Sequence, residues 1–230
     1  MSIADKLMEI ADKIPQVYNT GFQKGMETVD SKSILYYASL INNVFGGVAF
    51  PENYEAELRF KKAPQNCGYM FNNCRNLKSV KLISEQEQTA VDFQSAFNLA
   101  NNGTATLEIV DFREFCRKIK SSFNLCFNNQ YELKSILGAL DLSAVTSVAN
   151  AFYNCRSLTN IELVPETAFV SISFLQSPIL SDYSIQSIID GLATITDGVA
   201  RTLTLHADVK AKLTEAQIVT ITTTKGWTLA

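Results

Sequence analysis

The string F-x-N-C-R-x-L-x-x-[VI]-x-L occurs twice in this chain of 230 residues, from Phe71 to Leu82 and from Phe152 to Leu163. A looser form, F-x-x-[CA] followed by L-x-x-[VI], occurs four times. Its phenylalanines stand at intervals of 26, 26 and 29 residues: Phe71, Phe97, Phe123 and Phe152. Because a unit this short has too little interior to fold alone, the recurrence predicts copies that stack and share one elongated core.

Each copy also predicts its own local structure. The L-x-x-[VI]-x-L part alternates as a short strand, and the segment before each Phe predicts a helical or turn-like opposite wall. Phe and Leu are 6 residues apart in the outer two units and 10 apart in the middle two, which predicts polar insertions after Phe97 and Phe123. Cys74, Cys126 and Cys155 occupy the third position after Phe, where the second unit has Ala100. That column favours a small buried slot over a reactive thiol or metal cluster.

The expected fold class is an α/β solenoid: a right-handed stack of short strands with a helical or turn-like opposite wall. Three segments are expected, namely a helical segment over residues 1–30, the solenoid over residues 31–180, and an α/β C-terminal cap over residues 181–230. Apolar residues at heptad spacing in residues 1–30 indicate either a cap on the solenoid or a self-association arm.

The C-terminal segment predicts helix, strand, helix and strand in that order, continuous with the solenoid. Ser181 and Asp182 open the first helix. The stretch 201–206 alternates as a strand, and Thr214 with Gln217 fits a capping box that starts the second helix. A β-branched run follows that helix, and Trp227 begins the last strand.

Composition narrows the class of partner. A net charge of −3 with no Lys or Arg run argues against nucleic-acid binding. No apolar stretch has the length of a membrane-spanning helix or the form of a secretion signal. The chain is therefore expected to be cytoplasmic as written, or associated with a virion or phage tail if a phage encodes it. The five cysteines are expected to be reduced.

Catalytic chemistry has little support in the sequence. No metalloprotease, nucleophile-elbow, phosphate-loop or dinucleotide motif occurs. The one histidine, His206, is interpreted as a structural residue near Asp208. The chain is accordingly expected to be no enzyme and to use no cofactor or metal. A hydrolase acting on cell-wall carbohydrate is the weakest alternative.

The strings MFNNCRNLKSVKL and AFYNCRSLTNIEL resemble the BspA type of leucine-rich repeat, found in many bacterial surface proteins. Segments near both termini are similar to those of such proteins in gut-type Gram-positive bacteria, often encoded beside prophage tail genes. The resemblance implies a curved, usually non-catalytic scaffold for adhesion or protein–protein contact. It carries no fixed ligand motif.

The leading hypothesis is a non-enzymatic scaffold that binds a protein or a cell-surface glycan through the outward positions of its strands. These candidate positions are Lys78, Ser79, Lys81, Glu108, Lys134, Ser135, Thr159, Asn160 and Glu162. The alternative is a phage-tail-associated structural or assembly protein that forms a homo-oligomer through residues 1–30.

Overall fold

The computed structural model describes residues 49–60, 66–84, 91–99 and 104–230. The predicted N-terminal helix over residues 1–30 lies outside these ranges. Most of the described strands are short, and they pair in parallel in one four-stranded, one two-stranded and one three-stranded sheet. The solenoid class, its handedness and the domain limits stay predictions.

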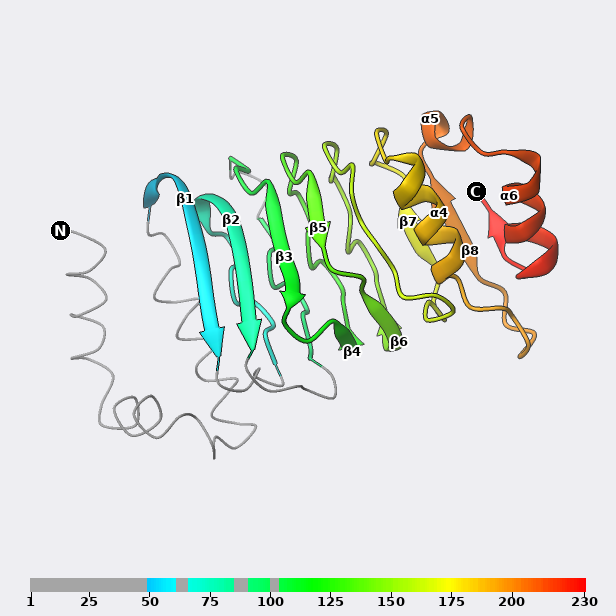
Figure 1. Cartoon of the computed structure of the whole chain (residues 1–230), viewed down its shortest axis with the longest axis horizontal. Coiled ribbons are helices and arrows are strands. Elements are labelled where there is room, and N and C mark those ends of the chain that lie inside the picture. The colour runs from blue at the N-terminus through cyan, green and yellow to red at the C-terminus, as the bar shows by residue number, and fades with distance from the viewer. Residues whose placement is uncertain (1–48, 61–65, 85–90, 100–103) are drawn as a thin grey trace.

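The four-stranded sheet has the order β1-β2-β3-β5, and these strands lie side by side in Figure 1. Their bounds are Ala49–Phe60, Arg75–Ser84, Ile109–Glu114 and Ser135–Leu137. A two-stranded sheet pairs β4, Lys118–Ser122, with β6, Asp141–Ser147. Because β4 and β6 fall in segments that precede the repeat phenylalanines, this wall contains short strands as well as turns and is not helical there.

A column of five phenylalanines runs through the interior. Neighbouring rings stack with centroid separations of 5.3, 5.3, 6.0 and 4.7 Å in the order Phe71, Phe97, Phe127, Phe152, Phe174. The predicted alignment is therefore wrong in the third unit, because Phe127 occupies the column and Phe123 packs edge-on against it. Phe174 adds a fifth unit that the sequence pattern missed.

The corrected alignment removes one predicted insertion. Phe127 is 6 residues before Leu133, as in the outer units, so only the second unit keeps the longer spacing. The next columns are fully interior, with exposures of 3% or less for their members: Leu77, Leu107, Leu133, Leu158 and Leu180, then Val80, Val110, Ile136 and Ile161. One hydrophobic cluster contains all of these side chains.

The cysteine slot is corrected in the same way. Cys74 and Cys155 are buried three residues after their phenylalanines, but Gln130 holds that position in the third unit and Ser177 in the fifth. Cys126 is buried one residue before Phe127 instead. Ala100 lies outside the described residues.

Left-handed backbone recurs at fixed places in the turns around the phenylalanine column. Two residues after Phe, φ is 58° at Asn73, 63° at Asn129 and 60° at Asn154. Asparagine tolerates this conformation better than most residues, because its short polar side chain forms local hydrogen bonds. The repeated Asn of the sequence motif therefore has a backbone cause.

Helix α4, Asp182–Gly191, ends the row of strands. Ser181 caps the helix by accepting from Ser184 N, as the sequence predicted. The hydroxyl oxygens of Ser184 and Ser187 accept from Ile161 N and Leu163 N at 2.9 and 3.0 Å. The helix thus satisfies the amide groups that a further strand would have bonded.

The C-terminal elements confirm the predicted order of secondary structure. β7, Ile172–Phe174, pairs with β8, Thr202–Leu205, which pairs with β9, Thr228–Leu229. A short helix α5, Ala207–Lys210, was not predicted. The expected capping box is present at α6, Glu215–Val219, and the β-branched run after it forms the π-helix η1, Thr220–Thr224.

Buried polar groups hold the C-terminal end of the chain against the rest of the fold. The Lys225 ammonium donates to the Glu166 carboxylate and to the carbonyl oxygens of Asp190 and Leu192. Trp227, 2% exposed, donates from its indole nitrogen to Ala193 O at 2.8 Å. These contacts attach the last strand to the end of α4.

Candidate functional site

The candidate binding positions lie in rows across the four-stranded sheet, because each strand is in register with its neighbour. Backbone bonds of 2.7–2.9 Å set the first row: Lys78, Glu108, Lys134 and Thr159. The second row is Glu55, Ser79, Ile109, Ser135 and Asn160. The third row is Glu57, Lys81, Asp111 and Leu137. We call these three rows the charged face.

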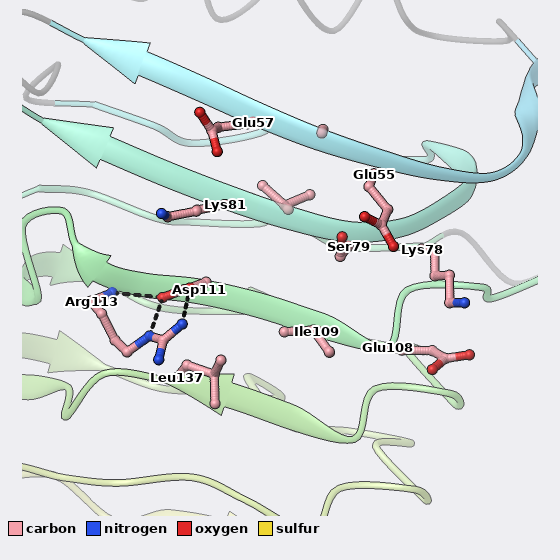
Figure 2. A pocket seen from close by; sticks show the side chains of 12 residues that line it. Glu55, Glu57, Lys78, Ser79, Lys81, Glu108, Ile109, Asp111, Arg113 and Leu137 are labelled. Atoms are coloured by element: carbon pink, nitrogen blue, oxygen red, sulfur yellow. Dashed lines mark hydrogen bonds and ion pairs between the residues drawn. The ribbon is translucent and has the colours of Figure 1, made fainter.

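An open hollow of about 470 Å³ lies on the charged face. Figure 2 shows its lining, with side chains from β1, β2, β3 and β5. The small Ser79 lies near the middle, the apolar Ile109 and Leu137 line one part, and charged side chains surround them. The hollow therefore offers ion-pairing groups next to apolar surface.

Three ion pairs cross or follow the strands of this face. Lys81 pairs with Glu114, Arg113 with Asp111 at 2.7 Å, and Lys134 with Glu108 at 2.9 Å. The Asp111 side chain is only 9% exposed, so its bidentate contact with Arg113 is the most sheltered of the three.

These ion pairs also shift the pKa values of the side chains that form them. The hydrogen bond from Arg113 lowers the pKa of Asp111 below its ordinary value and raises the pKa of Arg113. The hydrogen bond from Lys134 lowers the pKa of Glu108. Both carboxylates are therefore charged throughout the neutral range.

Four of the nine predicted positions line the hollow: Lys78, Ser79, Lys81 and Glu108. Lys134 and Ser135 continue the first two rows beyond it, as do Thr159 and Asn160. Asn160 donates to the Ser135 hydroxyl at 3.1 Å. The Glu162 carbonyl oxygen accepts from Leu140 N, so this residue lies farther along the same segment than Asn160.

Eight lining residues were missed as site residues: Glu55, Ala56, Glu57, Val80, Ile109, Asp111, Arg113 and Leu137. Glu55 and Glu57 stand at outward positions of β1, in register with Ser79 and Lys81. Carrying the outward positions of β2 across to β1 and β3 would have found most of the set.

The buried thiols and the histidine have structural positions in the fold. Burial raises the pKa of the Cys74 thiol to about 12 and also raises the pKa values of Cys67, Cys126 and Cys155. These thiols stay protonated at neutral pH and are poor nucleophiles. His206 caps α5, its Nδ1 accepting from Asp208 N at 3.2 Å.

Within the described ranges, no cluster of three or more His, Cys, Asp or Glu side chains has the form of a metal site. In the same part of the chain, no helix has the length and apolar character needed to cross a bilayer. Comparisons with protein-family models, curated proteins and solved structures gave no match.

Proposed function

We propose that this chain is a non-enzymatic binding scaffold of the BspA-like leucine-rich-repeat type, which contacts a protein partner through its charged face. The observation that carries the proposal is the hollow over β1, β2, β3 and β5, where ion-paired and apolar side chains stand at positions fixed by strand register. Side chains on such a sheet are held in place before binding, so little order has to be gained when a partner docks.

The arrangement of charge supports a protein as the partner. Charges of opposite sign alternate along the third row at Glu57, Lys81 and Asp111, and Arg113 pairs with Asp111, so the surface is neither a polycation nor a polyanion. A surface that combines opposite charges with apolar side chains such as Ile109 and Leu137 resembles the mixed polar and apolar make-up of protein–protein interfaces. Electrostatic complementarity of this kind mainly sets association rate and specificity.

The test begins with the full-length protein immobilised and exposed to bacterial and host-cell extracts. A retained protein is identified and purified, and its affinity is then measured against a variant that reverses three charges on the face: Lys78→Glu, Lys81→Glu and Lys134→Glu. We expect affinity to fall at least tenfold, with most of the change in association rate at low salt.

The matched control makes the same type of change away from the face, with Lys118→Glu on β4 and Lys210→Glu on α5. Both lysines are exposed. This control should bind like the unmodified protein. Equal affinities for the face variant and the unmodified protein, with both folded, would remove the charged face from consideration.

A further inference from the structure

The turns around the phenylalanine column contain no charged residue. Five segments of seven residues carry these turns: residues 67–73, 93–99, 123–129, 148–154 and 170–176. None of them contains Asp, Glu, Lys, Arg or His, in a chain with 23 Asp or Glu and 20 Lys or Arg. We call these five segments the neutral band.

Backbone bonds make the band one continuous surface. Three N–H···O bonds of 2.7–3.0 Å join each of the first three turns to the next, for example Phe71 N to Ala96 O and Phe97 N to Cys126 O. The fifth turn follows through Gln176, whose side-chain oxygen accepts from Asn154 N at 2.8 Å. The spacing between turns is therefore fixed.

A ladder of amides runs along this band at the position after each phenylalanine. Asn128 Nδ2 donates to Asn98 Oδ1 at 2.7 Å, and Asn98 Nδ2 donates to Asn72 Oδ1 at 3.2 Å. A side-chain amide has two N–H donors and an oxygen with two lone pairs. Asn98 therefore keeps one donor and one acceptor beyond the ladder, and this residue is half-buried.

Two exposed tyrosines flank the ladder. Tyr69, 43% exposed, lies in the first turn and its hydroxyl accepts from Gln94 Nε2 at 3.3 Å. Tyr153, 46% exposed, takes the ladder position in the fourth turn, where the next amide would stand. With neighbouring turns about 4.8 Å apart, three steps place the two tyrosine-bearing turns about 14 Å apart.

We infer that the neutral band is a second binding site, separate from the charged face, for a neutral oligosaccharide. Sugar hydroxyls both donate and accept hydrogen bonds, which matches the paired donor and acceptor of each ladder amide. Tyrosine combines an apolar ring for the C–H face of a sugar with a polar tip. The lack of charge disfavours nucleic acids and sulfated or carboxylated glycans, and the length of the band fits several sugar units.

The experiment uses the full chain with immobilised neutral probes (β-1,3-glucan, mannan and chitin oligosaccharides) and with heparin as the acidic comparison. Binding is measured at low and high NaCl. We expect retention on at least one neutral probe and none on heparin. The retention should be insensitive to salt, because no ion pair forms.

Variants then locate the site. The double variant Tyr69→Ala with Tyr153→Ala should bind about tenfold more weakly. Tyr183→Ala is the matched control, since Tyr183 is 66% exposed on α4, outside the band. The triple lysine variant of the charged face should bind the sugar normally, which separates this proposal from the proposed protein-binding function. All variants should keep the melting temperature of the unmodified protein within a few degrees, because each replaced side chain is exposed or half-exposed.

Four results would overturn the inference. These are no retention on any neutral probe, preference for heparin with release by salt, equal loss of binding in the Tyr183→Ala control, and a band variant that is folded and binds normally.

Discussion

The charged face and the neutral band are built by the same repeat, yet they differ in almost every chemical respect. On the charged face, three ion pairs join side chains that stand on hydrogen-bonded strands or directly before them. On the neutral band, amides bond to amides between turns that have left-handed backbone. The difference lies in what each backbone requires of its side chains.

The outward side chains of a strand do not have to hydrogen-bond the backbone, because neighbouring strands satisfy its N–H and C=O groups. Charge can therefore vary there from unit to unit. A left-handed turn selects Asn at particular positions, such as Asn73 and Asn129, and the half-buried amides at the neighbouring ladder positions need partners. Backbone demands do not explain the exposed Tyr153 or Leu175, however, so the neutrality of the exposed positions is a separate property of this chain.

The largest difference is expected in the interior beneath the two surfaces. Phe127 is fully buried and stacks on Phe97 and Phe152 below the band. Phe127→Ala should lower the free energy of unfolding by about 3–5 kcal/mol, because it leaves a large cavity in the stack. Beneath the charged face, Ile136→Val should cost only about 0.5–1.5 kcal/mol. Urea unfolding measures both, and a loss below that of Ile136→Val would show that the stack contributes little.

An Asn-to-Asp change distinguishes the surfaces directly. Asn98→Asp removes the donor to Asn72 and places a carboxylate against its oxygen, so the free energy of unfolding at neutral pH should fall by about 1–2 kcal/mol. The same change at Asn160, exposed on the charged face, should cost less than about 0.5 kcal/mol. Thermal or urea unfolding of both variants measures the contrast. Equal losses would mean that the ladder is no more sensitive to charge than the sheet.

The interior of the fold could largely be predicted from residue spacing. Short units with recurring Phe, Leu and Ile or Val positions predicted the buried columns, and cap residues such as Ser181 and Thr214 marked helix starts correctly. The third unit failed because Cys126 completes an F-x-x-C match with Phe123, whereas Gln130 spoils the match with Phe127. Only pairing between units, Phe127 N to Ala151 O, decides the register.

The candidate site was predicted in part for a similar reason. Lys78, Ser79 and Lys81 were found from the alternation of one strand. Asp111 and Arg113 were missed because the second unit was represented by Glu108 alone. The hollow depends on which residues face each other across three strand pairings, and local alternation carries that information only after the strand order is known.

A stabilising change is expected where the cysteine slot holds a hydroxyl. Ser177 is 0% exposed, and its Oγ has no hydrogen-bond partner among the described residues. Ser177→Ala removes an unpaired buried hydroxyl beneath the end of the neutral band and should raise the free energy of unfolding by about 1 kcal/mol. Ser143→Ala, at an exposed position on β6, should change it by less than about 0.5 kcal/mol. A higher urea midpoint for Ser177→Ala alone is the expected result, and a lower one would show that the hydroxyl is satisfied.

The smallest expected effect is a pH dependence of stability, which should be present for the charged face and absent for the neutral band. Because the hydrogen bond from Arg113 lowers the pKa of Asp111 from 3.8, the unfolded chain binds a proton at Asp111 more readily than the folded one. The stability that this pair contributes is therefore complete above about pH 5 and is lost as the pH falls through the folded-state pKa. It should amount to less than about 1 kcal/mol, since Arg113 is largely exposed.

The difference in unfolding free energy between the unmodified protein and Asp111→Asn should shrink from pH 7 to pH 3. For Asn98→Ala in the neutral band, where no group titrates in this range, the corresponding difference should stay constant. Urea titrations at several pH values measure both slopes, and a slope for the band variant as steep as that for Asp111→Asn would contradict the proposed contrast.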